Sequence, residues 1–242
     1  MSILEDILAT KRDEVTVLRR PETRALLRSR ALDAPPVRDF AAALRRPDGH
    51  LAVIAECKRR SPSKGELAPD LDPAVTASAY AAGGAAAMSV LTDAEYFGGR
   101  IADLQAARDA VEIPILRKDF TIDEVQVYEA RAIGADAILL ILAALPDDAH
   151  LMDLHDLARS LDLGVLVEAH DRDEIARGVG LGVGILGVNA RDLATFGEDL
   201  GAAAASGAGI PAGTVAVAES AIRSVDDAAA MAAVGFDAVL VG

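Results

Sequence analysis

Apolar residues follow two different patterns along this chain, and the change between them falls near residue 50. Before that point their spacing is helical, and the capping-box motif Ser2-Ile3-Leu4-Glu5 predicts a helix over residues 2 to 20 that Pro21 ends. Lys11 is expected to be exposed on this helix. A second, short helix is predicted from Val37 to Arg46, ahead of the turn Pro47-Asp48-Gly49. Residues 1 to 48 are therefore expected to form a helical extension packed on the domain that follows.

From residue 51 the pattern changes to short apolar runs separated by segments long enough for a helix. This alternation is typical of repeated βα units and a parallel sheet. Eight runs are predicted strands: Leu51–Cys57, Ala87–Leu91, Ile113–Leu116, Ala137–Leu142, Val165–Val167, Ile185–Val188, Val215–Ala218 and Ala238–Val241.

Eight strands are the number that closes a TIM barrel. The predicted fold class is therefore α/β, a (β/α)8 barrel that forms a single catalytic domain over residues 49 to 242. Asp72-Pro73 supplies an N-cap and a first-turn proline for the helix after the first strand, and Gly83-Gly84 ends that helix. An open doubly wound sheet is the alternative, but the glycine fingerprint that usually follows its first strand is absent.

Composition narrows the classes of ligand. The chain has 242 residues, 52% of them hydrophobic, and a formal net charge of −14, so it offers no basic field to nucleic acid or an anionic membrane surface. No run of 18 apolar residues could span a membrane, and the N-terminus is acidic where a signal peptide would be basic. The single cysteine, Cys57, excludes an internal disulfide and is expected to be a small buried residue. These features predict a cytoplasmic protein in which local groups bind any anionic ligand.

Charged and amide side chains follow the ends of several predicted strands, where a barrel collects its chemistry. Only four lysines occur against twenty arginines, and three of these lysines lie at or just after strand ends. This choice matters because surroundings can tune the pKa of a lysine toward neutrality, whereas arginine stays charged. An exposed loop charge is the alternative for any one position, and Glu56 with Lys58 could be a surface pair. Polar groups at the ends of five predicted strands are hard to explain by chance and favour a common site. Its members would be Glu56 and Lys58, Lys118, Glu168, Asn189 with Arg191, and Glu219-Ser220.

Several blocks of sequence resemble the indole-3-glycerol phosphate synthase family, and they match it in order and spacing along the whole chain. The blocks are IAECKRRSPSKG at 54–65, SVLTD at 89–93 with FGG at 97–99, LRKDF at 116–120, VE at 167–168, GVNARDL at 187–193 and AES at 218–220. The resemblance implies a (β/α)8 barrel of tryptophan biosynthesis. Its members are carbon-carbon lyases that convert 1-(2-carboxyphenylamino)-1-deoxyribulose 5-phosphate into indole-3-glycerol phosphate with loss of CO₂ and water. The resemblance implies neither a metal nor an organic cofactor. A monomer is expected, and association with other enzymes of the tryptophan pathway is left open.

The same resemblance implies catalytic roles. Lys118 would be the general acid at the substrate carbonyl, and Lys58 would pair with the anthranilate carboxylate. Glu168 and Glu56 would be base and stabiliser, and Asn189 would orient the substrate hydroxyls. Which of the two lysines acts in dehydration stays open. Glu219 and Ser220 complete the implied catalytic set.

The resemblance also implies residues that bind the substrate. Phe97 and Phe120 would flank its aromatic ring, with core filling as the alternative for each. The loop from Arg59 to Gly65 would be a mobile lid whose Lys64 can reach an anion. The substrate-binding set predicted in this way is Ser61, Lys64, Phe97, Phe120, Arg191, Ala221 and Gly242.

The phosphate end of the site departs from the family pattern. Ala221 stands where the family commonly has glycine, and a positive φ there would cost alanine about 1–2 kcal/mol. The sequence stops at Gly242, directly after the last predicted strand, so we expect a truncated form that lacks the final barrel helix. Either Val239 and Val241 or Ala238 and Leu240 would then lose part of their cover.

Two other function classes stay open from sequence. Another phosphate-binding barrel, such as a phosphoribosyl isomerase or a sugar-phosphate epimerase, needs one acid/base pair. Such chemistry does not account for two lysines, three glutamates and Asn189 at the strand ends. A non-catalytic binding module, or an inactive truncated form, would bind the substrate without turnover.

Overall fold

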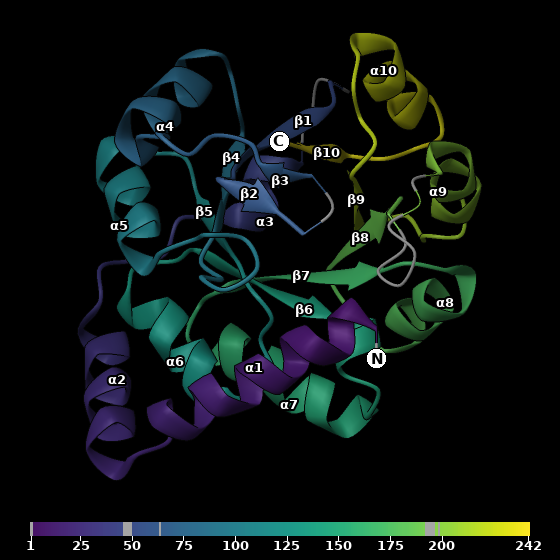
Figure 1. The fold of residues 1–242 in the computed structure, drawn as a ribbon. Coiled ribbons are helices and arrows are strands. Elements are labelled where there is room, and N and C mark those ends of the chain that lie inside the picture. The colour runs from purple at the N-terminus through teal and green to yellow at the C-terminus, as the bar shows by residue number, and fades with distance from the viewer. Residues whose placement is uncertain (1, 46–49, 63, 192–196, 198) are drawn as a thin grey trace.

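The computed structural model describes residues 2–45, 50–62, 64–191, 197 and 199–242, and a closed barrel of parallel strands lies at its centre (Figure 1). Each barrel strand pairs with the next along the chain, and the last pairs with the first. This topology confirms the predicted (β/α)8 barrel. The strands are β1 (Ala52–Cys57), β4 (Ala87–Leu91), β5 (Ile115–Lys118), β6 (Ala137–Ile141), β7 (Gly164–Ala169), β8 (Ile185–Asn189), β9 (Val215–Glu219) and β10 (Ala238–Val241).

One strand is displaced from its predicted position. The apolar run Ile113–Leu116 predicts a strand that starts two residues too early, since β5 begins at Ile115. Pro114 precedes it and has no N–H to give to a ladder, so regular pairing begins after the proline. The shift places Lys118 inside the strand rather than beyond it.

A ring of helices surrounds the barrel (Figure 1). Asp72 caps the first of them as predicted, because its carboxylate accepts the N–H groups of Ala74 and Val75. The helices after the strands are α4 (Pro73–Ala82), α5 (Ile101–Ala110), α6 (Glu124–Ala132), α7 (Asp148–Ser160), α8 (Arg172–Gly180), α9 (Leu200–Gly207) and α10 (Val225–Ala233), with a 3₁₀ turn η1 at Leu142–Ala144.

Over residues 2–45 the N-terminal extension has one more helix than predicted. Its helices are α1 (Ile3–Leu18), α2 (Pro21–Asp33) and α3 (Phe40–Leu44). The capping box at Ser2 and Glu5 is formed. Pro21, however, begins α2 as well as ending α1, because proline is well tolerated in the first turn of a helix.

The two other elements of the extension cover different parts of the barrel. α2 buries only Ala31 and lies beside α6, where the Arg28 guanidinium sits 5.4 Å from the Tyr128 ring centroid. α3 is shorter than the predicted 37–46 helix and buries Phe40 and Leu44 with the inward-facing core of the barrel. The predicted turn at 47–49 lies outside the described residues.

Lys11 is buried, so its expected exposure is wrong. Only 1% of the residue is accessible, and its ammonium contacts carboxylates of two barrel loops. The helical period places Lys11 one turn from Ile7 and Val15, on the face of α1 that turns to the barrel. A charge can occupy such a face because its partners are buried with it.

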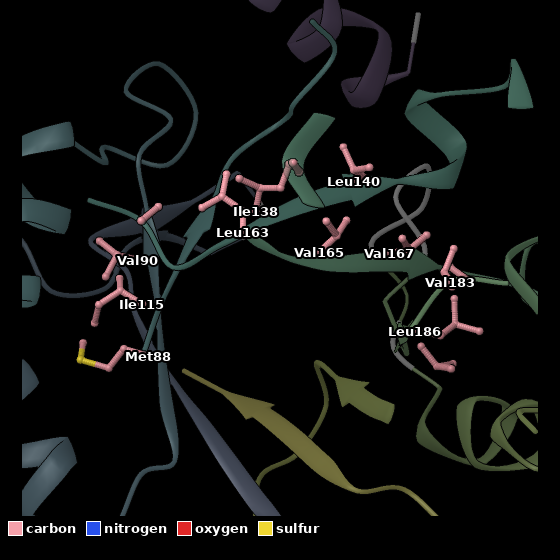
Figure 2. Close-up of a cluster of buried hydrophobic side chains, with 14 of the residues drawn as sticks. Met88, Val90, Ile115, Ile138, Leu140, Leu163, Val165, Val167, Val183 and Leu186 are labelled. Atoms are coloured by element: carbon pink, nitrogen blue, oxygen red, sulfur yellow. The ribbon is translucent and has the colours of Figure 1, made fainter. Parts of the chain in front are cut away.

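The core has two layers that follow the alternation of side chains along each strand. Odd and even positions separate cleanly on β6, where Leu139 faces the barrel interior and Ile138 and Leu140 face the helices. Figure 2 shows part of the outer layer, which contains Val165 and Val167 of β7 together with Ile138 and Leu140. The inner layer positions the ends of the strands.

The last strand is better covered than expected. Ala238 and Leu240 belong to the inner layer, and Val239 points outward but is only 1% accessible. The expected exposure is therefore wrong for Val239, which packs in the outer layer, and only Val241 is partly accessible.

Candidate active site

The last inward-facing position at the end of each barrel strand lines one pocket, and for β10 this position is Gly242, directly after the strand. Because side chains alternate, these residues all point into the barrel near the carboxyl ends of the strands, and together they are called the strand-end layer. In strand order the layer consists of Glu56, Leu91, Lys118, Ile141, Glu168, Asn189, Glu219 and Gly242. Polar groups thus gather on one side of an otherwise apolar barrel interior.

All of the residues predicted for the site line this pocket. Besides members of the layer, they include Lys58, Ser61, Lys64, Phe97, Phe120, Arg191, Ser220 and Ala221. The alternative that the strand-end charges are unrelated surface groups is therefore wrong. Residues that the sequence reasoning missed also line the pocket, among them Leu67, Ile222 and Arg223. They lie within three residues of predicted positions, but no sequence pattern marks them.

Lys118 connects two buried carboxyl groups. Its ammonium lies 3.0 Å from Glu168 Oε2 and 3.4 Å from Glu219 Oε2. Asn189 donates its amide N–H to the other oxygen of Glu168 at 3.1 Å. These four side chains come from β5, β7, β8 and β9, so barrel closure is what brings them together.

The electrostatics set different protonation states for these groups at neutral pH. Burial opposes the charge of Lys118, but Glu168, Glu219 and Glu56 outweigh that effect and raise its pKa, so the amine is protonated. Burial likewise opposes ionisation of Glu168, yet Lys118 and hydrogen bonds from His170 and Asn189 hold its pKa well below the ordinary value. For Glu219, burial and the negative charge of Glu168 win and raise the pKa to about 8. The site therefore holds an ammonium, a carboxylate and a neutral carboxylic acid in contact.

Gly187 makes room for Glu219. A Cβ at position 187 would lie 2.1 Å from Glu219 Oε1, a distance that no side chain tolerates. Gly187 occupies the inward position of β8 one layer below Asn189. Glycine at this position is thus a requirement of the site rather than of the backbone.

A second ion pair lies at the end of β1. The Lys58 ammonium contacts the Glu56 carboxylate directly, and both side chains line the pocket. Cys57, between them in sequence, points into the outer layer, where burial raises its thiol pKa to about 12. This confirms the expectation that the cysteine is a buried residue, and it leaves the thiol unsuited to act as a nucleophile.

His170 contacts Glu168 from outside the pocket and was not predicted. Its Nε2 lies 3.2 Å from Glu168 Oε1, and its Nδ1 lies 3.2 Å from Glu174 Oε2. Burial would lower the pKa of His170, but the two carboxylates raise it to about 10, so the imidazole is charged at neutral pH. Its position two residues after Glu168 was the available signal.

The described part of the loop after β1 is anchored at its base, and its expected role as a lid stays a prediction. It folds into a two-stranded antiparallel ribbon, β2 (Arg60–Ser61) and β3 (Gly65–Glu66), which lies near the carboxyl ends of the strands in Figure 1. Arg59 anchors its base through a fork to Asp103 at 2.9 and 3.0 Å and through the carbonyl of Leu71 at 2.8 Å. Ser61 and Lys64 stand on this ribbon at the rim of the pocket.

Two aromatic rings form one wall of the pocket. The centroids of Phe97 and Phe120 are 6.1 Å apart, and the ring planes meet at 36°. Both side chains line the pocket, so they are available to a ligand and do not only fill the core. Such a pair suits the flat face of an aromatic group.

The opposite end of the pocket is formed by the turn after β9. Ser220 and Ala221 have φ angles of +65° and +58°. Ala221 therefore adopts the left-handed conformation, in which alanine is strained. Arg191, Arg223 and Gly242 lie in the same part of the lining. A Cβ on Gly242 would lie 2.9 Å from that of Glu56, so glycine also permits the close approach of these two strand ends.

Neither a membrane-spanning helix nor a metal-binding cluster is present in the described part of the chain. No helix there is long and apolar enough to cross a membrane. No group of three or more histidine, cysteine, aspartate or glutamate side chains there is arranged to hold a metal ion.

A closed barrel with acid and base groups at the carboxyl ends of its strands is the arrangement of a (β/α)8-barrel enzyme. The indole-3-glycerol phosphate synthase family model matches residues 4–242. Synthases of this name from Arthrobacter sp. (strain FB24) and Laribacter hongkongensis (strain HLHK9) are 50% and 49% identical to the chain and align with 100% and 99% of it, and with 90% and 92% of their own lengths. The chain belongs to the indole-3-glycerol phosphate synthase family.

Solved structures with little sequence similarity share the fold. A 3-hexulose-6-phosphate synthase superimposes with a TM-score of 0.62 at 17% identity, over 79% of this chain and 90% of its own. The N-acetylmannosamine-6-phosphate 2-epimerase from Clostridium perfringens gives 0.64 at 13% identity, over 86% and 91%. These likenesses support the barrel alone. The family match confirms the synthase activity expected from sequence over the isomerase and epimerase alternatives.

Proposed function

We propose that this pocket catalyses the carboxy-lyase reaction of its family, in which 1-(2-carboxyphenylamino)-1-deoxyribulose 5-phosphate closes to indole-3-glycerol phosphate with loss of CO₂ and water. The observation that carries the proposal is the contact of the Lys118 ammonium with Glu168 and Glu219 at the base of a pocket walled by two aromatic rings. Ring closure needs a proton for the substrate carbonyl while an aromatic carbon attacks it.

Lys118 supplies that proton. Because the surrounding carboxylates keep its pKa raised, the amine arrives at the reaction charged, and its position deep in the pocket lets it reach a carbonyl above Glu168. Lys58 directly follows β1, which only β4 separates from β5 in the barrel, and it pairs with the substrate carboxylate that leaves as CO₂. Its present contact with Glu56 is an ion pair that the substrate carboxylate would share or replace.

The carboxyl groups divide the remaining acid–base work. Glu168 is ionised and accepts the proton that leaves during dehydration, and Asn189 holds one of its oxygens in place. Glu219, with a pKa near 8, is neutral at pH 7 and can donate a hydrogen bond to a substrate hydroxyl, which a carboxylate cannot. Glu56 remains the stabiliser of the positive charge on Lys58.

The ends of the substrate bind to opposite walls. The anthranilate ring lies against Phe97 and Phe120, with Ser61 of the ribbon above it. The phosphate takes backbone N–H groups at Ser220, Ala221 and Gly242. Arg191 and Lys64 add positive charge at the rim of the pocket. We further propose a cytoplasmic monomer that uses no metal or organic cofactor, with association with other tryptophan-pathway enzymes left to experiment.

The experiment is turnover of the carboxyphenylamino substrate, followed by the appearance of indole fluorescence and by released CO₂ in equal amounts. The proposal requires both products from the purified chain without added metal. Binding of the substrate without either product would support a non-catalytic module and would contradict the proposal. A ribulose phosphate that lacks the aromatic group serves as the control and should not be consumed.

A further inference from the structure

Lys11 reaches from the N-terminal extension into the barrel. Its ammonium lies 2.8 Å from Asp93 Oδ2 and 3.0 Å from Asp119 Oδ1, and it also contacts Glu14 of its own helix at 2.8 Å. Both aspartates are almost fully buried, and they belong to the loops after β4 and β5. One amine therefore ties α1 to two loops at the active-site end of the barrel.

Asp119 links Lys11 to the end of β5. It directly follows Lys118, and its Oδ1 accepts the N–H of Phe120 at 2.8 Å. Its Oδ2 accepts the hydroxyl of Thr92 at 2.6 Å and an N–H of Arg117 at 3.3 Å. The residue held by Lys11 therefore lies in the chain between the proposed general acid and Phe120, one of the two rings of the aromatic wall.

Asp93 links Lys11 to Phe97, the other ring of the aromatic wall. Its Oδ1 accepts the N–H groups of Tyr96 at 2.7 Å and Phe97 at 3.1 Å, which fixes the turn that presents Phe97. The hydroxyl of Tyr96 also lies 3.1 Å from that of Thr10, next to Lys11 on α1. The extension thus fixes this turn through two contacts.

The two aspartates depend on Lys11 to different degrees. Asp119 also contacts Arg117, so it keeps a cation if Lys11 is lost. Asp93 is fully buried, and within the described residues Lys11 is the only cation that forms an ion pair with it. Burial opposes the charge of Lys11, but the carboxylates outweigh it and raise the pKa, so the amine stays protonated through the working pH range. Removing the amine would leave a buried carboxylate unpaired at the base of the turn that carries Phe97.

We propose that Lys11 is a positioning residue for the synthase reaction: through Asp93 and Asp119 it sets the spacing of Phe97 and Phe120 and the placement of Lys118. The inference rests on the proposed binding of the anthranilate ring against the wall that these two phenylalanines form. It predicts a kinetic effect that exceeds any loss of stability, since a shift of about 1 Å in a reacting geometry can cost about 10²-fold in rate.

The test compares Lys11→Met with Arg108→Met. Arg108 forms an ion pair with Asp136, which is also fully buried but precedes β6 at the opposite end of the barrel. Both variants remove a cation from a buried aspartate, so both should lower the thermal midpoint. Only Lys11→Met should raise KM for the carboxyphenylamino substrate and lower kcat, by about 10- to 10²-fold in kcat/KM, measured at least 15 °C below each midpoint. Arg108→Met should stay within about twofold of wild type in kcat/KM.

Two further variants keep the test decisive if Lys11→Met does not fold. Asp93→Asn keeps the acceptor for Phe97 and removes the ion pair, so it should raise KM by a smaller factor, and Lys11→Arg should recover most of the loss. Wild-type kinetics in Lys11→Met or Asp93→Asn would overturn the inference, as would an equal loss in Arg108→Met. The proposed function fails separately, because in that case the wild-type chain itself would form no product.

Discussion

The turn after β9 carries a backbone strain that one substitution should relieve. Ala221 has φ +58°, in the left-handed region where an L-residue with a Cβ costs about 1–2 kcal/mol. Glycine removes that cost, but it gains about 0.4–1 kcal/mol of conformational freedom in the unfolded chain. The net stabilisation of Ala221→Gly is therefore about 0.5–1 kcal/mol, which for a chain of this size corresponds to a rise of roughly 1–4 °C in the thermal midpoint.

Thermal unfolding followed by circular dichroism measures this shift, with Ala212→Gly as the matched control. Ala212 lies in an exposed turn without a positive φ, so glycine there should lower the midpoint. The backbone N–H proposed to bind phosphate is kept in Ala221→Gly, and KM should stay within about twofold of wild type. A midpoint that falls in Ala221→Gly as much as in Ala212→Gly would refute the reasoning.

Three other outcomes follow from the site. Glu168→Gln keeps the shape of the side chain but removes the base, so kcat should fall about 10²- to 10⁴-fold with a modest change in KM, and a variant with most of its turnover would make Glu168 structural. Gly187→Ala forces the Glu219 carboxyl to move, because the new Cβ would lie 2.1 Å from it, and steady-state kinetics should show a lower kcat even though the substituted residue touches no substrate. His170 has a folded-state pKa near 10, above its ordinary value near 6.5, so its contribution to stability is complete below pH 6.5 and is lost as the pH rises toward 10. Urea unfolding across that range should show a flatter pH dependence for His170→Asn than for wild type, and equal slopes would contradict the charge assigned to His170.

The strands and the polar layer at their ends could be predicted because both depend on local patterns. Apolar runs at barrel strands are short and sharply bounded, and the period of two then selects Glu56, Lys118 and Glu168 as inward-facing residues. Closure of the sheet brings such positions together whatever the helices between them look like. The inward-facing polar groups of the pocket therefore follow from the sequence once eight strands are recognised.

The features that the sequence did not reveal depend on contacts across the chain. Lys11 resembles any helical surface lysine until Asp93 and Asp119 are placed beside it. The helix α2 has almost no apolar face, because it buries only Ala31, so no hydrophobic period marks it. The positive charge of His170 depends on its contact with Glu174, which lies in the first turn of α8. That contact forms only when the chain between the two residues is folded. In each case the feature is set by what packs against the segment in the folded protein, and the local sequence does not show it.

The central claim is that Lys118 protonates the substrate carbonyl between Glu168 and Glu219. Lys118→Met keeps the length of the side chain and removes its proton, so single-turnover formation of indole fluorescence from the carboxyphenylamino substrate tests the claim directly. The account predicts a rate about 10²- to 10⁴-fold below wild type at saturating substrate. A Lys118→Met variant that forms product at more than about a tenth of the wild-type rate would contradict it.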